Sequence, residues 1–393
     1  MNDVLVVGGG PAGLYVGLRL AQAGFSIALF EEHQGAGEPV HCTGVLAREA
    51  FEEFGLSTAS ILNELSAVKF YAPAGGKIEY ATPSVEAVVV DRMGFDQSLA
   101  RKAVGAGVQM SSGQRVTSVD VDSDGVRVGA GTAGRAGRAG RMVARGRVCL
   151  LACGASYALQ RKLGLGMPRL LLHSAQVEVP AASLGHVEVH FGRSVAPQGF
   201  AWAVPVQRDR PYVRIGLMCD RGAGPHFSDI VSRLSVRWGI TASDVRQPRQ
   251  KILPLGPIER TYGDRVIALG DAAGLVKPTT GGGIYYSLVS AGLAAQTLVE
   301  LLSRDELTAE SLAIYERRWR QRIGAELRWQ LLLRRIAHRL SDEDIDALFE
   351  LARTDGIMPI VRRTAAFNHH REFISALFKH PPARRLLLRA VVA

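Results

Sequence analysis

A thiol and an imidazole stand side by side in the stretch GEPVHCTG, which runs from Gly37 to Gly44 and contains His41 and Cys42. A cysteine can act as a nucleophile or as a weak acid, and a histidine can move protons near neutral pH. The four cysteines, at positions 42, 149, 153 and 219, have neither metal-site spacing nor the density of a disulfide scaffold. We therefore predict no metal site, and the chemistry of Cys42 and His41 depends on what lies beside them.

A glycine-rich turn stands close to the N-terminus, between a predicted strand and a predicted helix. Its glycines are Gly8, Gly10 and Gly13, which permit a tight turn, close approach of a diphosphate and close helix–strand packing. The next predicted strand ends at Glu31, where a carboxylate can accept both hydroxyls of an adenosine ribose. The stretch predicts a βαβ dinucleotide site, to which we also assign Pro11, Ala12 and Glu32.

A second glycine-rich stretch follows a buried strand pattern far downstream, where the sequence reads GDAAGLVKPTTGGGI. Asp271 at the strand end can hold a ribitol hydroxyl, and the glycines at the helix start can place N–H groups against the O2/N1 edge of a flavin. Together the two stretches resemble the FAD fingerprints of the p-hydroxybenzoate-hydroxylase-like flavoprotein superfamily, over most of residues 1–300. The resemblance implies that FAD contacts Gly270, Asp271, Pro278, Gly281, Gly282, Gly283 and Ile284.

Other segments predict the surrounding elements. Residues 68–81 and 201–218 alternate around turn residues and predict hairpins of an antiparallel sheet, and Asp91 is a plausible N-cap of a helix. Residues 129–147 contain three Ala-Gly-Arg units. Because this tract lacks interleaved aromatic residues, we interpret it as a flexible, solvated hairpin loop rather than as a nucleic-acid-binding segment.

After Ser303 the chain becomes helical and rich in arginine. Apolar residues recur every four positions, at Tyr315, Trp319, Ile323 and Leu327, which predicts an amphipathic helix. We favour packing of this helix on the protein's own body over membrane binding.

These patterns predict an α/β fold: a Rossmann-like FAD-binding domain, an inserted antiparallel β-sheet substrate domain and a helical C-terminal region. The FAD-binding domain is expected to be discontinuous, at 1–64, 86–165 and 255–302. The substrate domain is expected at 65–85 and 166–254, and the helical region at 303–393.

Within that superfamily the chain most resembles the geranylgeranyl reductase family. The resemblance rests on GEPVHCTG, on DRMGFD at 91–96, on FAWAVP at 200–205, which is similar to the family's YxWxFP motif, and on GDAAGLVKPTTGGGI. Members of this family use FAD to saturate isoprenoid C=C bonds. The resemblance implies the same reaction here, with Cys42, Gly44, Arg92 and Gly154 beside the cofactor and a substrate wall of Phe200, Trp202, Pro205 and Tyr285.

Two departures from the pattern concern the same sites. Cys153 stands where the superfamily usually has an aspartate that helps to hold FAD and pyridine nucleotide, so the electron donor, NADPH or another reductant, is left open. Phe200 and Val204 replace the Tyr and Phe of the YxWxFP motif, which removes a phenol and shrinks one wall of the pocket.

Reduction of an unactivated trisubstituted alkene needs a proton as well as a hydride. Protonation first, with capture of the tertiary cation by a flavin N5 hydride, avoids a poorly stabilised carbanion. That route requires a proton donor in a water-poor cavity. Cys42 and His41 are the predicted catalytic residues, although a thiol is a weak acid toward an alkene and Cys42 can instead simply line the cavity.

Two other functions remain open, a class A flavin monooxygenase and a flavoprotein that passes electrons to a quinone. We expect an isoprenoid or lipid substrate, no nucleic acid and no metal, with a redox partner protein still open. The net charge of +10 suits phosphorylated ligands or an anionic membrane face. With no leader visible, we expect a cytoplasmic protein whose membrane contact, if any, is peripheral to the inner face.

Overall fold

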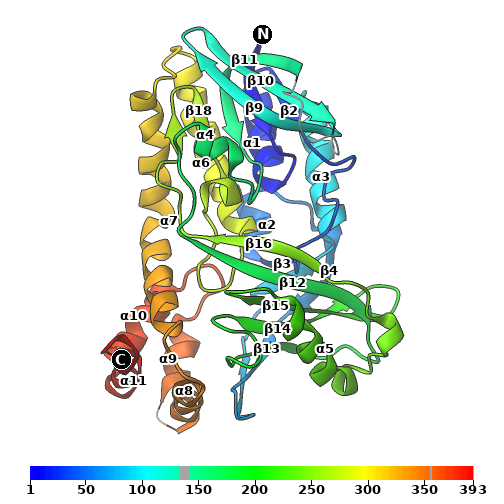
Figure 1. The fold of residues 1–393 in the computed structure, drawn as a ribbon, viewed down its shortest axis with the longest axis vertical. Helices are drawn as coiled ribbons and strands as arrows, with labels where there is room; N and C mark the ends of the chain where they lie inside the picture. Colours follow the sequence, from blue (N-terminus) through cyan, green and yellow to red (C-terminus); the bar gives the residue numbers. More distant parts are fainter. Residues whose placement is uncertain (133–140, 355, 393) are drawn as a thin grey trace.

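The computed structural model describes residues 1–132, 141–354 and 356–392. Figure 1 shows a parallel sheet with its helices at one end of the long axis, a second sheet at the other end, and a group of C-terminal helices beside that second sheet. This mixed α/β arrangement confirms the predicted fold class.

The parallel sheet has the order β18-β11-β1-β2-β8, and β17 extends it as an antiparallel edge. The central strand β1 reads as an unbroken apolar run because both of its faces are buried, and Val4 to Val7 are at most 4% exposed. The strands are β1 (Asn2–Val7), β2 (Ile27–Phe30), β8 (Gln109–Ser111), β11 (Arg141–Leu151), β17 (Tyr262–Gly263) and β18 (Val266–Ala268).

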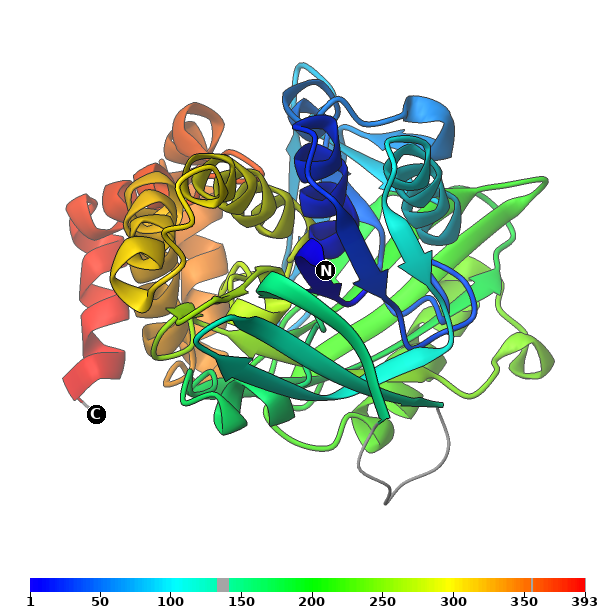
Figure 2. The ribbon, with the colours of Figure 1, turned by 90° about the horizontal axis from the view of Figure 1, so that it is seen from above.

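Helices cover one face of this sheet and an antiparallel meander lies on the other, as Figure 2 shows. The helices are α1 (Pro11–Gln22), α3 (Arg92–Gly105) and α6 (Ile284–Leu302); the meander is β9 (Gln114–Asp122), β10 (Gly125–Thr132) and β11. The prediction of a hairpin loop over 129–147 was wrong for the two ends of this range, which belong to strands β10 and β11. Its centre lies outside the described residues.

A seven-stranded sheet, in the order β16-β12-β15-β14-β13-β5-β6, forms the second layer. Both predicted hairpins are confirmed, as β5 with β6 and as β14 with β15. The strands are β5 (Ala67–Tyr71), β6 (Lys77–Ala81), β12 (Leu170–Pro180), β13 (Val187–His190), β14 (Phe200–Gln207), β15 (Pro211–Cys219) and β16 (Arg249–Leu255). Helix α5 (Gly224–Trp238) packs on the face that β12, β14 and β15 turn toward it.

A third, small sheet has the order β3-β7-β4. In the sequence, its strands come between strands of the two larger sheets. It is formed by β3 (Val45–Ala47), β4 (Ile61–Leu65) and β7 (Ala87–Val90), with α2 (Glu49–Glu53) after β3. The proposed domain boundaries stay a prediction. The strands of the seven-stranded sheet fall within 65–85 and 166–254, except that β16 ends one residue later, at Leu255.

The C-terminal region is helical, as predicted. It comprises α7 (Ala309–Ala337), α8 (Asp342–Thr354), α9 (Ile357–Thr364), α10 (Arg371–Lys379) and α11 (Pro381–Val392). The apolar stripe of α7 is buried in the main core: Trp319 is 1% exposed, and its Nε1 donates to Thr261 Oγ1 at 2.9 Å. The preferred interpretation, packing on the protein's own body, is confirmed. Asp91 does precede α3, but its side chain makes no capping hydrogen bond.

Candidate active site

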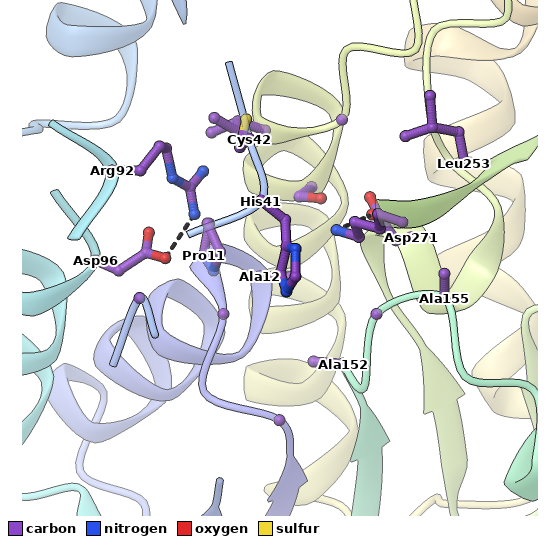
Figure 3. A pocket seen from close by; sticks show the side chains of 18 of the residues that line it. Pro11, Ala12, His41, Cys42, Arg92, Asp96, Ala152, Ala155, Leu253 and Asp271 are labelled. Atoms are coloured by element: carbon purple, nitrogen blue, oxygen red, sulfur yellow. Dashed lines mark hydrogen bonds and ion pairs between the residues drawn. The ribbon is translucent and has the colours of Figure 1, made fainter. Parts of the chain in front are cut away.

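A cavity of about 1200 Å³ lies between the carboxyl ends of the parallel strands and one face of the seven-stranded sheet. Its polar half is lined by the β1–α1 turn, the end of β2 and the loop before α6. Its other half is lined by alternate side chains of β12, β13, β14 and β16. Figure 3 shows His41 and Cys42 within the cavity, between Arg92 on one side and Asp271 on the other.

The β1–α1 turn has the shape that its three glycines predict. Gly8 has a φ of +109°, and a Cβ on it would overlap the Ala152 carbonyl oxygen. A Cβ on Gly13 would overlap the Gly8 carbonyl oxygen, so this glycine allows α1 to pack against the turn. No atom lies within 4 Å of a Cβ position on Gly10, which leaves the backbone open to a diphosphate.

Two helices begin at this cavity without a capping side chain, α1 after Gly10 and α6 after Gly283. Free N–H groups in a first helical turn and the helix dipole favour negative charge there. A Cβ on Gly283 would lie 2.6 Å from Asp271 Oδ1, so a larger residue at the start of α6 would displace the Asp271 carboxylate. The two helix ends suit the diphosphate and the pyrimidine edge of FAD.

Glu31 ends β2 at the cavity, where the sequence predicts the ribose site, but its oxygens are already engaged. Oε2 accepts a hydrogen bond from the Gly9 N–H at 2.6 Å, and Oε1 lies 2.9 Å from the His33 N–H and 2.6 Å from His33 Nδ1. A carboxylate has about four acceptor positions. Glu31 therefore has room for one ribose hydroxyl rather than for two, unless His33 moves. Glu32 also lines the cavity, beside Arg115.

A buried ion pair on α3 forms the wall beside the β1–α1 turn. Arg92 Nη2 lies 2.5 Å from Asp96 Oδ2, and both residues are less than 10% exposed. Arg92 Nε and Asp96 Oδ1 have no hydrogen-bond partner, and a buried polar atom without a partner is costly. An anionic ligand in the cavity would satisfy Arg92, which agrees with its prediction as an FAD contact.

Asp271 stands at the other side of the polar half, in the short turn after β18. Its Oδ2 lies 3.5 Å from Lys251 Nζ on β16, and its backbone carbonyl oxygen accepts a hydrogen bond from the Tyr157 hydroxyl at 2.5 Å. The carboxylate thus faces the cavity at the start of α6, as a ribitol-binding residue must.

The 37–44 loop is fixed to the seven-stranded sheet. Gly44 has a φ of +73°, and a Cβ on it would lie 2.6 Å from Arg214 Nη1. The same Nη1 donates to the Thr43 carbonyl oxygen at 2.6 Å, while Thr43 Oγ1 donates to Gln176 Oε1 at 2.6 Å. These contacts hold Cys42 at the cavity, where its Sγ accepts a hydrogen bond from the Gly44 N–H at 3.3 Å.

His41 lies in the cavity with its Nδ1 buried and without a partner. Burial, together with the nearby cations Lys251 and Arg249, lowers the pKa of His41. The imidazole is therefore neutral at pH 7, and it is suited to hydrogen bonding with a ligand rather than to protonating an alkene.

The other half of the cavity is mostly apolar, and its polar side chains are Ser174, Gln176 and Lys251. Trp202 and Phe200 line it from β14, with ring centroids 5.8 Å apart. A Cβ on Gly216, opposite Trp202 on β15, would overlap the indole, and the indole Nε1 donates to Gln176 Oε1 at 3.3 Å. The remaining apolar lining includes Val45, Leu46, Val187, Val189, Val204 and Leu253.

The C-terminal region also reaches the cavity, which the sequence did not predict. The segment between α9 and α10 contributes Phe367, Asn368 and His370, which stand next to Lys277 and Tyr285. Tyr285 lines the cavity with its ring, while its hydroxyl donates to Glu53 Oε2 at 2.7 Å. The position of Lys277 inside the glycine-rich FAD motif could have marked it as a site residue. No local sequence pattern indicates that Phe367 and Asn368, 90 and 91 positions later, also belong to the site.

The cavity brings together most of the predicted site residues. Four do not line it: Gly13 faces the Gly8 carbonyl oxygen, Gly270 faces Ser287 on α6, and Pro205 and Pro278 lie behind the lining. The Pro278 carbonyl oxygen accepts a hydrogen bond from Arg334, and the Pro205 carbonyl oxygen accepts one from Asn63. Gly154 and Gly281 to Ile284 line the cavity as predicted.

Cys153 lines the cavity beside Gly154, at the position where the resemblance to the superfamily leads us to expect an aspartate. Burial raises the pKa of the Cys153 thiol to about 11, so the group is neutral at pH 7. It therefore supplies no negative charge for holding a second nucleotide.

Comparisons with known proteins agree with this geometry. The family model described as lycopene cyclase protein matches residues 3–353. The digeranylgeranylglycerophospholipid reductase 2 of Methanothermobacter thermautotrophicus is 30% identical, over 88% of this chain and 90% of that protein. The digeranylgeranylglycerophospholipid reductase 1 of Methanopyrus kandleri is also 30% identical, over 91% of this chain and 98% of that protein.

Solved structures with lower identity show the same fold. A geranylgeranyl bacteriochlorophyll reductase-like protein from Thermoplasma acidophilum superposes with a TM-score of 0.84 at 20% identity, over 99% of both chains. A halogenase in complex with FAD superposes with a TM-score of 0.70 at 15% identity, over 99% of this chain and 85% of that one.

Proposed function

The chain belongs to the lycopene cyclase protein family and to the geranylgeranyl reductase family of FAD-dependent oxidoreductases, and from this we propose that it reduces C=C bonds of an isoprenoid lipid. The observation that carries the proposal is the single cavity with two unlike halves. One half has the glycine turns, uncapped helix ends and unpaired Arg92 atom that fit FAD. The other half is walled by mainly apolar side chains from four strands of the seven-stranded sheet, and this surface fits a prenyl chain.

FAD, when bound, supplies the hydride that ends on one carbon of the double bond. The residues of this chain bind the cofactor, bind the substrate and exclude water. The β1–α1 turn and Arg92 would hold the diphosphate of FAD, and Asp271 would hold its ribitol. Phe200 and Trp202 bind the hydrocarbon and exclude water, which keeps the reacting carbon away from competing nucleophiles.

A prenylated phospholipid is the substrate class that the relatives suggest, since two of them are named digeranylgeranylglycerophospholipid reductases. We propose that such a substrate is presented at the inner face of a membrane and that membrane contact is peripheral. The net charge of +10 suits an anionic lipid surface. No helix among the described residues is long and apolar enough to cross a bilayer.

The electrons are proposed to come from NADPH or from another reductant such as a redox partner protein. Anaerobic mixing of the FAD-loaded protein with NADPH tests the first source, because bleaching of the oxidised flavin absorbance within seconds is expected if NADPH is the donor. An unchanged spectrum would exclude NADPH and leave another reductant, such as a redox partner protein, as the donor.

Mass spectrometry of lipid extracts tests the function itself. Cells that lack the gene are expected to accumulate prenyl lipids that are lighter by two mass units for each bond left unsaturated. Restoring the gene should return the saturated species. Identical lipid profiles with and without the gene would contradict the proposal.

A further inference from the structure

Lys277 places a primary amine at the wall of the cavity, in the loop before α6. It lies between η3 (Gly270–Ala273) and α6, in the same loop as the glycines that fit the flavin, and it lines the cavity while only 4% exposed. The Lys277 N–H donates to the Gly282 carbonyl oxygen at 3.1 Å, and a Cβ on Gly282 would lie 2.9 Å from Lys277 Cε. The side chain therefore runs along the flavin loop.

The amine is held by neutral groups. Nζ donates to the Phe367 carbonyl oxygen at 3.0 Å and to Asn368 Oδ1 at 3.1 Å, and it stands 4.3 Å from the centre of the Phe367 ring. Among the described residues, Lys277 forms no ion pair with a carboxylate within 4.0 Å. Glu49 reaches the amine only through Asn368, whose Nδ2 donates to Glu49 Oε1 at 2.7 Å. The amine is positioned by Asn368 but is not neutralised.

Other titratable groups lie on the elements around this loop, and Lys251 of β16 lies across the cavity beside Asp271. They are Glu49 on α2, Tyr285 and Tyr286 on α6, Glu326 and Arg334 on α7, His369 and His370 before α10, and Asp271 and Cys42 across the cavity. Burial raises the pKa of both tyrosines, and burial and Lys277 lower the pKa of His370 to about 4. These three groups keep their neutral forms at pH 7.

Lys277 itself does change charge near neutrality. Burial, opposed in part by Glu49, lowers the pKa of its ammonium group from 10.5 to about 7. A buried lysine without a carboxylate partner destabilises a fold, and a methionine would fill the same space without that cost. Such an unfavourable residue at the wall of a reaction cavity is typical of a group with a chemical role.

On the basis of the proposed function, we propose that Lys277 is the general acid of the reduction and delivers its Nζ proton to the alkene. The π electrons of the double bond form the new C–H bond, and Nζ keeps the electron pair of the N–H bond that breaks. The second alkene carbon then requires a hydride, which reduced FAD would supply when bound. Lys277 is left as a neutral amine and regains a proton from water between turnovers.

The proton and the hydride must move together in this step. An ammonium group is too weak an acid to leave a free tertiary carbocation behind, so protonation has to overlap with hydride capture. An acid whose pKa lies near the working pH is both populated and easily recharged. The proposal assigns the acid to the flavin loop, and it leaves Cys42 as a residue that lines the cavity.

Single-turnover kinetics test this assignment. The FAD-loaded protein is reduced with dithionite and mixed anaerobically with a geranylgeranyl lipid, and flavin reoxidation is followed from pH 5.5 to 9. The wild-type rate should fall as the pH rises through about 7. Lys277→Met removes the acid, and Lys277→Arg keeps a cation that does not release its proton in this range. Both should slow reoxidation at least 100-fold and lose the pH dependence.

Controls separate an acid from a structural residue. Lys162→Met changes an exposed lysine on α4 (Ala158–Lys162) and should keep the wild-type rate, and FAD binding by the two Lys277 variants should stay within threefold of wild type. Cys42→Ala should retain the wild-type pH profile. A Lys277→Arg protein with the wild-type pH profile would show that only charge matters and would overturn the proposal, as would undiminished reoxidation by Lys277→Met.

A second readout does not depend on turnover. Carbon-13 NMR of lysine Cε in the protein without FAD should show one resonance, absent in Lys277→Met, that titrates near pH 7. A Lys277 resonance that titrates near 10 would overturn the proposal. If wild-type protein reoxidises without adding two mass units to the lipid, the proposed function fails. If it adds them and Lys277→Met does so equally fast, only the assignment of the acid fails.

Discussion

Trp202 owes its place in the cavity to the glycine that faces it. A Cβ on Gly216 would overlap the indole ring, and the indole also depends on its hydrogen bond to Gln176. The sequence predicted Trp202 as a wall residue but gave no reason to single out Gly216. The room for the Trp202 indole depends on the residue opposite it on the neighbouring strand, and a motif along one strand does not identify that residue.

Gly216→Ala should therefore displace the indole. We expect a loss of about 1–3 kcal/mol in the free energy of unfolding, as for other overpacked sites, and a KM for the prenyl lipid that rises severalfold while FAD affinity is unchanged. Urea unfolding and steady-state kinetics measure the two effects. Gly76→Ala is a matched control, because only Ala72 Cβ lies near its Cβ position, at 3.7 Å. Equal stability and KM for both variants would refute the packing argument.

Lys277 should also govern how stability depends on pH. Its folded-state pKa of about 7 lies below the ordinary value of 10.5, so between these two values the unfolded chain binds more protons than the folded chain. Stability contributed by this site rises as the pH increases from 7 to 10.5, and below pH 7 the cost of the buried charge is present in full. The upper limit of this cost is about 5 kcal/mol.

Lys277→Met should thus stabilise the protein, most strongly below pH 7, with the gain shrinking toward pH 10. Thermal unfolding of wild type and variant at several pH values between 5.5 and 10 measures the difference. A variant that is less stable than wild type at pH 6 would contradict the burial argument.

At the scale of elements, the 37–44 loop is joined to the sheet by a side chain that is far away in sequence. Arg214 on β15 is 2% exposed, donates to the Thr43 carbonyl oxygen and pairs with Glu178 at 2.7 Å. The predicted strand, helix and glycine stretches indicated that the loop lies beside the glycine turns, and the loop does line the same cavity as those turns. They could not identify Arg214, because its contact with the loop spans 171 residues and depends on how two sheets meet.

Arg214→Met should free the loop. We expect a loss of about 1–3 kcal/mol, because the carbonyl oxygens of Thr43 and Val90 lose their donor, and severalfold faster alkylation of Cys42 by iodoacetamide. Peptide mass mapping distinguishes Cys42 from the other three thiols. Arg208→Met is the matched control, since Arg208 pairs with the same Glu178 at 2.8 Å and makes no hydrogen bond to Thr43. If both variants leave Cys42 at its wild-type reactivity, Arg214 does not position the loop.

At the scale of the whole molecule, the site is built from parts that the sequence predicts unequally. The glycine turns, Glu31, Asp271 and the two hairpins follow from short local patterns, because each pattern and its structural consequence lie within a few residues. The segment with Phe367, Asn368 and His370 does not, because its place depends on how the C-terminal helices pack against the loop that contains Lys277. The helical region was predicted as an element but not as a part of the cavity.

The central claim is that one cavity holds reduced FAD and a prenyl chain and passes hydrogen between them. A single turnover of purified, FAD-loaded protein, reduced beforehand and mixed without oxygen with a geranylgeranyl lipid, tests it most directly. We expect the flavin to reoxidise as the lipid gains two mass units, with one bond saturated for each flavin oxidised. Reoxidation that leaves the mass of the lipid unchanged, or a flavin that stays reduced, would contradict the account.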